Sequence, residues 1–95
     1  MTRFTYQDLL AVVDGDRELI ELLVEEGEIQ RVGDDIVRVD VDRVLVARTL
    51  VRELEITWPG AEVILELRAA LVAARRKIAA LEAELAARDK TGPNR

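Results

Sequence analysis

The sequence predicts a mainly α-helical fold, in which a winged helix-turn-helix unit is followed by one long helix. Two short amphipathic segments flank the turn Asp14-Gly15-Asp16, and two β-branched runs flank a Gly-Asp turn. A heptad repeat of apolar residues then runs from Ile64 to Leu85. We therefore expect a winged helix-turn-helix domain over residues 1–56, a long helix over residues 57–90 and a disordered tail over residues 91–95.

The first two helices are predicted from their capping residues. Thr5 is placed to cap the first helix, and Asp8, three residues later, can complete a capping box. Asp16 is placed to cap a second helix that runs to Glu26, and Gly27 ends that helix. Two short helices across a tight turn are typical of a helix-turn-helix pair.

A hairpin and a third helix are expected next. Residues 28–32 and 36–39 are the two β-branched runs, and the turn between them makes a small wing. Asp40 is placed to cap the third helix. A bend over residues 55–57 leads into the long helix, whose first turn can accept Pro59 because proline has no N–H to lose.

The long helix carries an apolar seam whose residues are spaced alternately by three and four. The seam residues are Ile64, Leu67, Leu71, Ala74, Ile78, Leu81 and Leu85. This spacing is the signature of a helix that pairs in a coiled coil. The alternative is that the helix packs only on its own domain.

The charges beside the seam favour an antiparallel pair. An antiparallel arrangement brings together Arg68 with Asp89, Arg75 with Glu82, and Lys77 with Glu84. A parallel arrangement would set Glu84 against Asp89, which repel each other. We therefore predict an antiparallel homodimer through residues 64–88, with affinity supplied by the seam and orientation by the charged flanks.

The composition excludes several classes of chemistry. The chain has no cysteine and no histidine, which excludes a disulfide framework, a Cys/His zinc site and a Ser-His triad. We expect no catalytic residues, no metal ligands and no cofactor. No apolar run approaches the length of a membrane span and no signal peptide opens the chain, so we expect a cytoplasmic protein without membrane contact.

Charge is distributed unevenly along the chain. Residues 1–56 carry fourteen acids and seven bases, a balance of −7, whereas residues 57–95 carry five acids and seven bases, a balance of +2. The second helix would therefore present carboxylates to DNA, which argues against groove binding and favours a basic protein partner. The candidate partner-binding residues are Glu18, Glu21, Glu25, Glu26, Asp34 and Asp35. The alternative is a solvated acidic surface without a partner.

The bend and the start of the long helix resemble a known family. Leu54-Glu-Ile-Thr-Trp-Pro-Gly60, followed by Val63, Leu65 and Leu67, resembles the bacterial chaperone-modulator family of MerR-like proteins. Phe4-Thr5, the acidic second helix and the short wing are also similar. The resemblance implies a MerR-like winged helix-turn-helix that binds the J-domain of a DnaJ-type co-chaperone and blocks its docking on an Hsp70-type chaperone. Some relatives instead assemble the chaperone with its co-chaperone.

Two other functions remain open on the sequence. A MerR-like transcription regulator would need a positive surface, which Arg3, Arg17, Arg31 and Arg38 could form if the fold clusters them. A coiled-coil adaptor without a fixed class of partner would need only the seam. The uneven charge distribution favours the J-domain over DNA.

Overall fold

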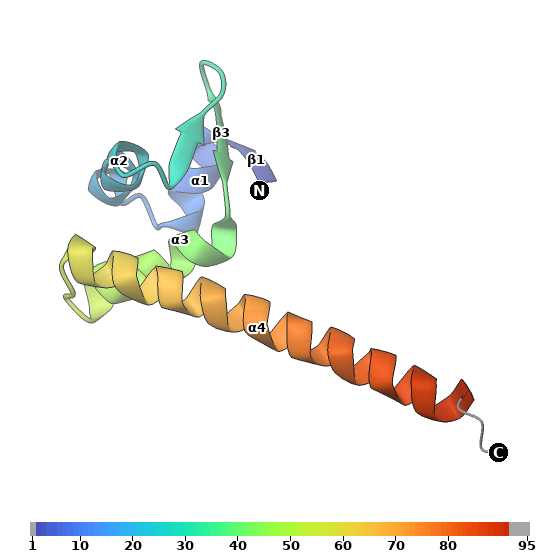
Figure 1. The fold of residues 1–95 in the computed structure, drawn as a ribbon. Coiled ribbons are helices and arrows are strands. Elements are labelled where there is room, and N and C mark those ends of the chain that lie inside the picture. Colours follow the sequence, from blue (N-terminus) through green and yellow to red (C-terminus); the bar gives the residue numbers. More distant parts are fainter. Residues whose placement is uncertain (1, 92–95) are drawn as a thin grey trace. The chain divides into compact units, whose positions relative to one another are not determined.

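The computed structural model describes residues 2–91 and divides the chain into two compact units, with the boundary between Ala61 and Glu62. It is mainly helical, with one small antiparallel sheet and a long C-terminal helix (Figure 1). The elements in order are β1 (Thr2–Thr5), α1 (Tyr6–Val12), α2 (Arg17–Glu25), β2 (Ile29–Arg31), β3 (Ile36–Val39), α3 (Val41–Arg48), the π-helix η1 (Thr49–Glu53) and α4 (Trp58–Thr91).

The helix caps predicted from the sequence are confirmed. The side chains of Thr5, Asp16 and Asp40 each accept a hydrogen bond from the amide three residues later, at 3.1, 3.1 and 3.2 Å. Gly27 follows the end of α2 in the left-handed region, with a φ of +80°. Each cap satisfies an amide that the first turn leaves without a helical partner, so local chemistry fixes where α1, α2 and α3 begin.

The sheet has one strand more than the sequence predicted. The expected hairpin forms, with β2 antiparallel to β3, but β1 also pairs with β3 and gives the order β1-β3-β2. Residues 4–5 were expected only as the start of a helix, and that interpretation missed the strand before it. Four residues are too few for an alternating pattern to be recognised, and this strand depends on its pairing with β3.

The core of the first unit is built from aliphatic side chains of every element between α1 and η1. The inward residues of the sheet, Ile29, Val37 and Val39, are buried, as are Leu19 and Leu23 of α2. No charged or polar residue is buried in the part of the chain that the structure describes. The first unit therefore rests on hydrophobic burial, with its charges at the surface.

The bend before α4 has a specific backbone geometry. The helix α3 continues directly into the wider π-helix η1, where the Leu54 N–H donates to the carbonyl of Thr49 at 2.9 Å. The Ile56 N–H donates to the carbonyl of Leu50 at 2.9 Å, and Glu55 between them has a φ of +54°. The sequence predicted the bend over residues 55–57, but not the π-helix that precedes it.

The long helix is regular from Trp58 to Thr91, so the expected tail loses Thr91 to the helix. The rest of that tail, residues 92–95, lies outside the described residues. Among the helices of residues 2–91, none combines the length and apolar character needed to cross a lipid bilayer.

Candidate partner-binding surfaces

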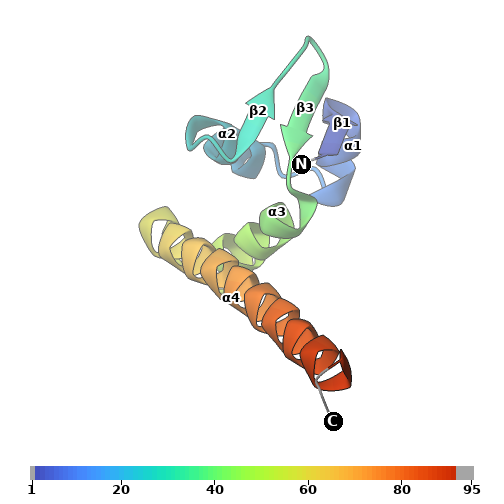
Figure 2. The same ribbon diagram turned by 45° about the vertical axis from the view of Figure 1, so that its right-hand side comes forward.

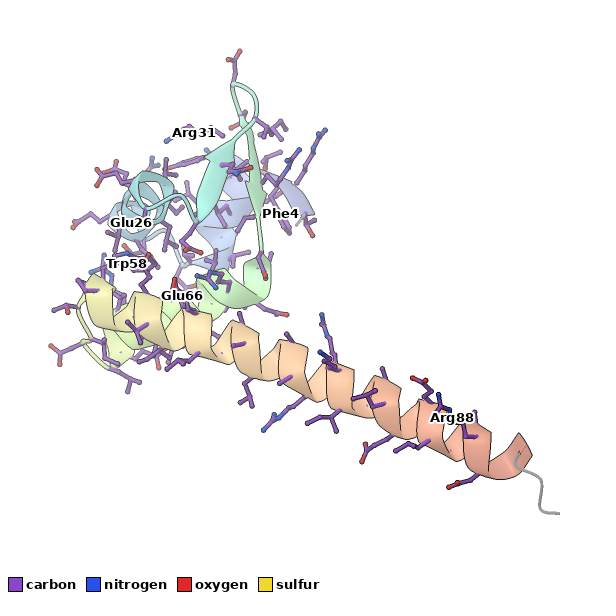
Figure 3. The ribbon with its side chains drawn as sticks, viewed as in Figure 1. Phe4, Glu26, Arg31, Trp58, Glu66 and Arg88 are labelled. Carbon is purple, nitrogen blue, oxygen red and sulfur yellow. The ribbon has the colours of Figure 1, made fainter. Side chains whose placement is uncertain are left out.

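The helix α2 is amphipathic, and its polar side is acidic. Leu19, Ile20 and Leu23 are buried, whereas Glu18, Glu21 and Glu25 are exposed. These three glutamates are spaced by three and four residues, which places them along one side of the helix. Glu26, directly after α2, is also exposed (Figure 3). The structure thus brings four of the six candidate residues together, three on α2 and Glu26 directly after it.

The other acids of this region are neutralised by arginines. Three arginines of α3 and η1 form ion pairs with carboxylates that lie just before α2 or just before β2. The pairs are Arg48 with Asp14 at 2.6 Å, Arg52 with Asp16 at 2.7 Å, and Arg43 with Glu28 through both of its oxygens. The seven acids from Asp14 to Glu28 therefore divide into three paired carboxylates and four, on or beside α2, that form no ion pair among residues 2–91.

The pair of Asp16 with Arg52 has the clearest electrostatic effect. Arg52 donates from Nε and Nη2 to the two carboxylate oxygens, at 2.7 and 3.1 Å. This hydrogen bonding lowers the pKa of Asp16 below its usual value and raises the pKa of Arg52. Asp16 also caps α2, so one carboxylate both starts the acidic helix and ties it to η1.

An apolar side chain lies among the free glutamates. Leu22 follows Glu18 by four residues and precedes Glu25 by three, so it lies on the same side of α2. Leu22 is only partly buried, unlike Leu19, Ile20 and Leu23. An apolar centre with a charged rim is the usual composition of a protein-binding surface. We call Glu18, Glu21, Leu22, Glu25 and Glu26 the α2 surface.

The remaining two candidate acids lie elsewhere. Asp34 and Asp35 are exposed in the turn between β2 and β3. Figures 1 and 2 both show this turn at the free end of the hairpin, away from α2. The Asp35 carbonyl accepts a hydrogen bond from the Tyr6 N–H at 2.9 Å, which fixes the turn against the start of α1. The structure therefore separates the hairpin acids from the α2 surface.

The four arginines considered for DNA binding do not form one cluster. Arg3 and Arg38 are directly opposite each other across β1 and β3. Arg31 belongs to the next row of the sheet and lies over the ring of Tyr6, 6.0 Å from its centre. Arg17 begins α2, next to the glutamates. Only two of the four arginines, Arg3 and Arg38, are therefore cross-strand neighbours. Among the described residues, the four arginines do not form a continuous basic surface that includes α2.

The apolar seam of α4 is exposed along its whole length. Leu67, Leu71, Ile78 and Leu85 are 64%, 51%, 55% and 58% exposed. Leu65 is buried, and at about 100° per residue it lies on the other side of the helix from the seam. Within the seam register, Arg88 pairs with Glu84 along the helix at 3.4 Å (Figure 3). The apolar side chains of the seam are therefore exposed in the single chain.

Trp58 lies at the bend, as expected, and is half-buried. Its indole N–H is shielded from solvent and donates to no acceptor within the described part of the chain. The partial burial of this side chain fits a packing role at the bend.

Comparison with protein-family models, with curated proteins and with solved structures found no match for this chain. Within residues 2–91, no group of three or more acidic side chains is arranged to hold a metal ion. The functional argument consequently depends on the surfaces themselves.

Proposed function

We propose that this protein is a non-enzymatic chaperone modulator that binds the J-domain of a DnaJ-type co-chaperone through the α2 surface. By covering the basic helix with which a J-domain docks on an Hsp70-type chaperone, it would inhibit that docking. The observation that carries the proposal is the set of exposed glutamates of α2, none of which forms an ion pair among the described residues. Of these glutamates, Glu18 lies close enough to Arg52 to add to the effect of Asp16 in raising the pKa of that arginine.

The physical basis of the proposal is electrostatic complementarity. Free carboxylates attract a basic helix, speed association and suppress binding to acidic partners. Charge at an exposed rim contributes modest affinity, so the partly buried Leu22 would supply an apolar contact at its centre. The arginines of α3 and η1 add specificity indirectly. They neutralise the nearby acids, which are then less able to bind the basic partner, and the unpaired negative charge is concentrated on α2.

The same proposal includes a MerR-like winged helix-turn-helix arrangement for the first unit. The order of α1, a short turn, α2, a hairpin and α3 supports it. In a DNA-binding protein of this kind the second helix enters the major groove. Here that helix would bring Glu18, Glu21 and Glu25 toward phosphates, so the arrangement favours a protein partner over DNA.

We also propose that α4 pairs with α4 of a second copy in an antiparallel coiled coil. Covering one exposed Leu or Ile of the seam is worth about 1.5–3 kcal/mol, whereas each flanking ion pair adds about 0.2–1 kcal/mol. The seam would thus supply the affinity. The flanks would select the orientation, because only the antiparallel register sets Lys77 opposite Glu84 and Arg75 opposite Glu82.

Calorimetric titration of the full chain with a purified J-domain, at low and high salt, tests the proposed function. We expect binding of micromolar affinity or tighter that weakens as salt screens the α2 surface. The variant Glu21→Lys with Glu25→Lys should reduce the affinity at least tenfold. Its control, Glu53→Lys with Glu66→Lys, makes the same charge change at two exposed sites outside the α2 surface and should bind normally.

Two results would contradict the proposal. Absence of binding at both salt concentrations would remove the J-domain as the partner. Equal losses in the α2 variant and its control would show that net charge matters and that α2 is not the docking surface.

A further inference from the structure

The outer face of the sheet presents two arginines side by side. Arg3 of β1 is paired directly with Arg38 of β3, and Gln30 of β2 lies opposite Arg38 on the other side. Residues directly opposite in an antiparallel sheet share a face, with Cβ atoms about 4.5–5.5 Å apart. Since Val37 and Val39 turn into the core, the alternation of the strand directs Arg38 and its two partners outward.

Arg3 and Arg38 differ from the arginines of the first unit that form ion pairs. Arg43, Arg48 and Arg52 each have a carboxylate partner, but Arg3 and Arg38 have none among residues 2–91. Like charges directly opposite each other destabilise a sheet. The pair therefore opposes folding slightly, while it presents two closely spaced positive charges to solvent.

An apolar row lies next to the arginines on the same face. Ile36 is opposite Thr5, two residues along β3 from Arg38. The Val32 N–H donates to the Ile36 carbonyl at 3.0 Å, which extends the ladder and places Val32 opposite Ile36. Val32 and Ile36 are 42% and 37% exposed. We call Arg3, Arg38, Val32 and Ile36 the outer sheet face.

We propose that the outer sheet face is a second docking surface, which binds an acidic protein segment with an apolar side chain beside its carboxylates. The two guanidinium groups can each donate hydrogen bonds to a carboxylate, and the apolar row can cover an aliphatic or aromatic side chain. Two arginines release too few counterions to hold a nucleic acid backbone firmly, and phosphates gain nothing from Val32 and Ile36.

The two docking surfaces occupy different elements of the first unit. Figures 1 and 2 both show α2 beside β2, whereas β1 forms the opposite edge of the sheet. At physiological salt, exposed charges separated by more than about 8 Å are largely screened from each other. The acids of α2 are therefore screened from the outer sheet face, and the acids nearest to it, Asp34 and Asp35, lie in the turn at the Val32–Ile36 end, two residues along β3 from Arg38. The arginine end can attract an acidic segment, and the inference does not depend on the J-domain.

The test is an NMR titration of the full chain with a ten-residue peptide that alternates Glu and Val. We expect saturable amide shifts centred on Arg3, Ile36 and Arg38, which decrease with added salt. The corresponding Lys-Val peptide should leave these amides unmoved. Shifts that never saturate, or that map to other elements, would overturn the proposal. If a ten-nucleotide single-stranded DNA bound at the same amides more tightly than the peptide, the ligand of this face would be a nucleic acid and the proposal of an acidic protein segment would be wrong.

A single substitution separates binding from folding. Arg3→Glu should weaken peptide binding about tenfold, because one of two cations becomes an anion. It should also raise the midpoint of thermal unfolding by about 1–5 °C, because Glu opposite Arg38 forms a favourable cross-strand pair. Its matched control is Arg76→Glu, an equal charge change at an exposed site on α4, which should leave both readouts unchanged.

Opposite movement of affinity and stability is the signature of arginines kept for binding. If Arg3→Glu lowered both the affinity and the unfolding midpoint, the pair would have a structural role and the proposal would fail. Arg38→Gln removes the second cation while keeping a long polar side chain, and should reduce the affinity about fivefold. Unchanged peptide affinity in Arg38→Gln would likewise exclude the outer sheet face as the binding site of the peptide.

Discussion

The two units of this chain treat their apolar side chains in opposite ways. In the first unit, every helix and strand except β1 contributes a buried side chain, and three arginines neutralise nearby acids. Along α4, the apolar seam stays exposed from Ile64 to Leu85 while the opposite side carries the buried Leu65. The first unit is built to be stable within one chain. In the proposed dimer the seam would gain its stabilisation from the partner helix, so the function proposed for α4 depends on association.

The largest expected effect comes from placing a charge in the middle of the seam. Ile78→Lys puts two buried ammonium groups into each dimer and removes two apolar contacts of about 2 kcal/mol each, so we expect dimer dissociation to increase at least about a thousandfold. Sedimentation equilibrium should show a monomer. The first unit should keep its thermal transition, because residue 78 belongs to the second unit.

A matched control distinguishes the seam from α4 in general. Arg76→Lys or Arg76→Glu changes an exposed site that lies outside the seam and its flanks, and the dimer should persist. A monomeric wild-type chain, or an Ile78→Lys variant that remains dimeric, would show that α4 does not pair through this seam.

The orientation of the pair can be read from disulfide formation, because the chain has no cysteine of its own. A mixture of Lys77→Cys and Glu84→Cys chains should form a mixed disulfide dimer under mild oxidation, and each variant alone should not. Crosslinking of Lys77→Cys with itself would indicate an antiparallel register shifted toward Lys77. Dimers that form no crosslink in the mixture would overturn the predicted antiparallel register.

In the first unit, removing a core side chain should unfold the protein without a direct effect on pairing. Leu23 of α2 is fully buried, so Leu23→Ala should lower the free energy of unfolding by about 2–5 kcal/mol. Urea titration measures the change. The control Leu71→Ala truncates the same residue type in the exposed seam and should lower the unfolding free energy of the isolated monomer by less than about 0.5 kcal/mol.

The same contrast explains what the sequence could and could not predict. Caps at Thr5, Asp16 and Asp40 are local chemistry, and a long heptad repeat is a strong periodic signal, so both were predicted. The strand β1 and the pairing of Arg3 with Arg38 depend on contacts between residues thirty-five positions apart in the chain. Such contacts leave no periodic pattern in four residues, so the outer sheet face was not foreseen.

The acidic run shows the same limit at the candidate site. In the sequence, the acids from Asp14 to Glu28 all carry the same formal charge, which gives no information about their partners. The structure brings Arg43, Arg48 and Arg52 to three of them. The arginines lie fifteen to thirty-six residues away along the chain, so only tertiary structure could show which carboxylates stay free.

The pair of Asp16 with Arg52 should produce a moderate, pH-dependent effect. Asp16→Asn keeps a good capping side chain but removes the charge, so at pH 7 it should lower the unfolding free energy by about 0.2–1 kcal/mol. The fold lowers the pKa of Asp16, so its contribution is fully present above the unfolded value of about 3.8. The contribution is lost as the pH falls through the folded pKa.

Urea titrations of wild type and Asp16→Asn across pH 2–7 should therefore converge in acid. The control Glu53→Gln removes an exposed carboxylate outside the ion pairs among residues 2–91, and should track the wild type at every pH. A difference for Asp16→Asn that stayed constant down to pH 2 would assign the effect to the cap and not to the ion pair.

The smallest expected effect is at the bend, where two opposing contributions to the free energy of unfolding nearly cancel. Glu55 holds a left-handed φ of +54°, which costs a residue with a Cβ about 1–2 kcal/mol, whereas glycine adopts it freely. Glycine also gives the unfolded chain more freedom, which costs about 0.5–1 kcal/mol. Glu55→Gly should therefore stabilise the first unit by about 0.5 kcal/mol in thermal unfolding.

Glu53→Gly, the same substitution two residues earlier inside η1, is the control. It should destabilise the first unit by about 1 kcal/mol, because only the greater freedom of the unfolded chain applies there. Equal signs for the two variants would show that the bend carries no strain at Glu55.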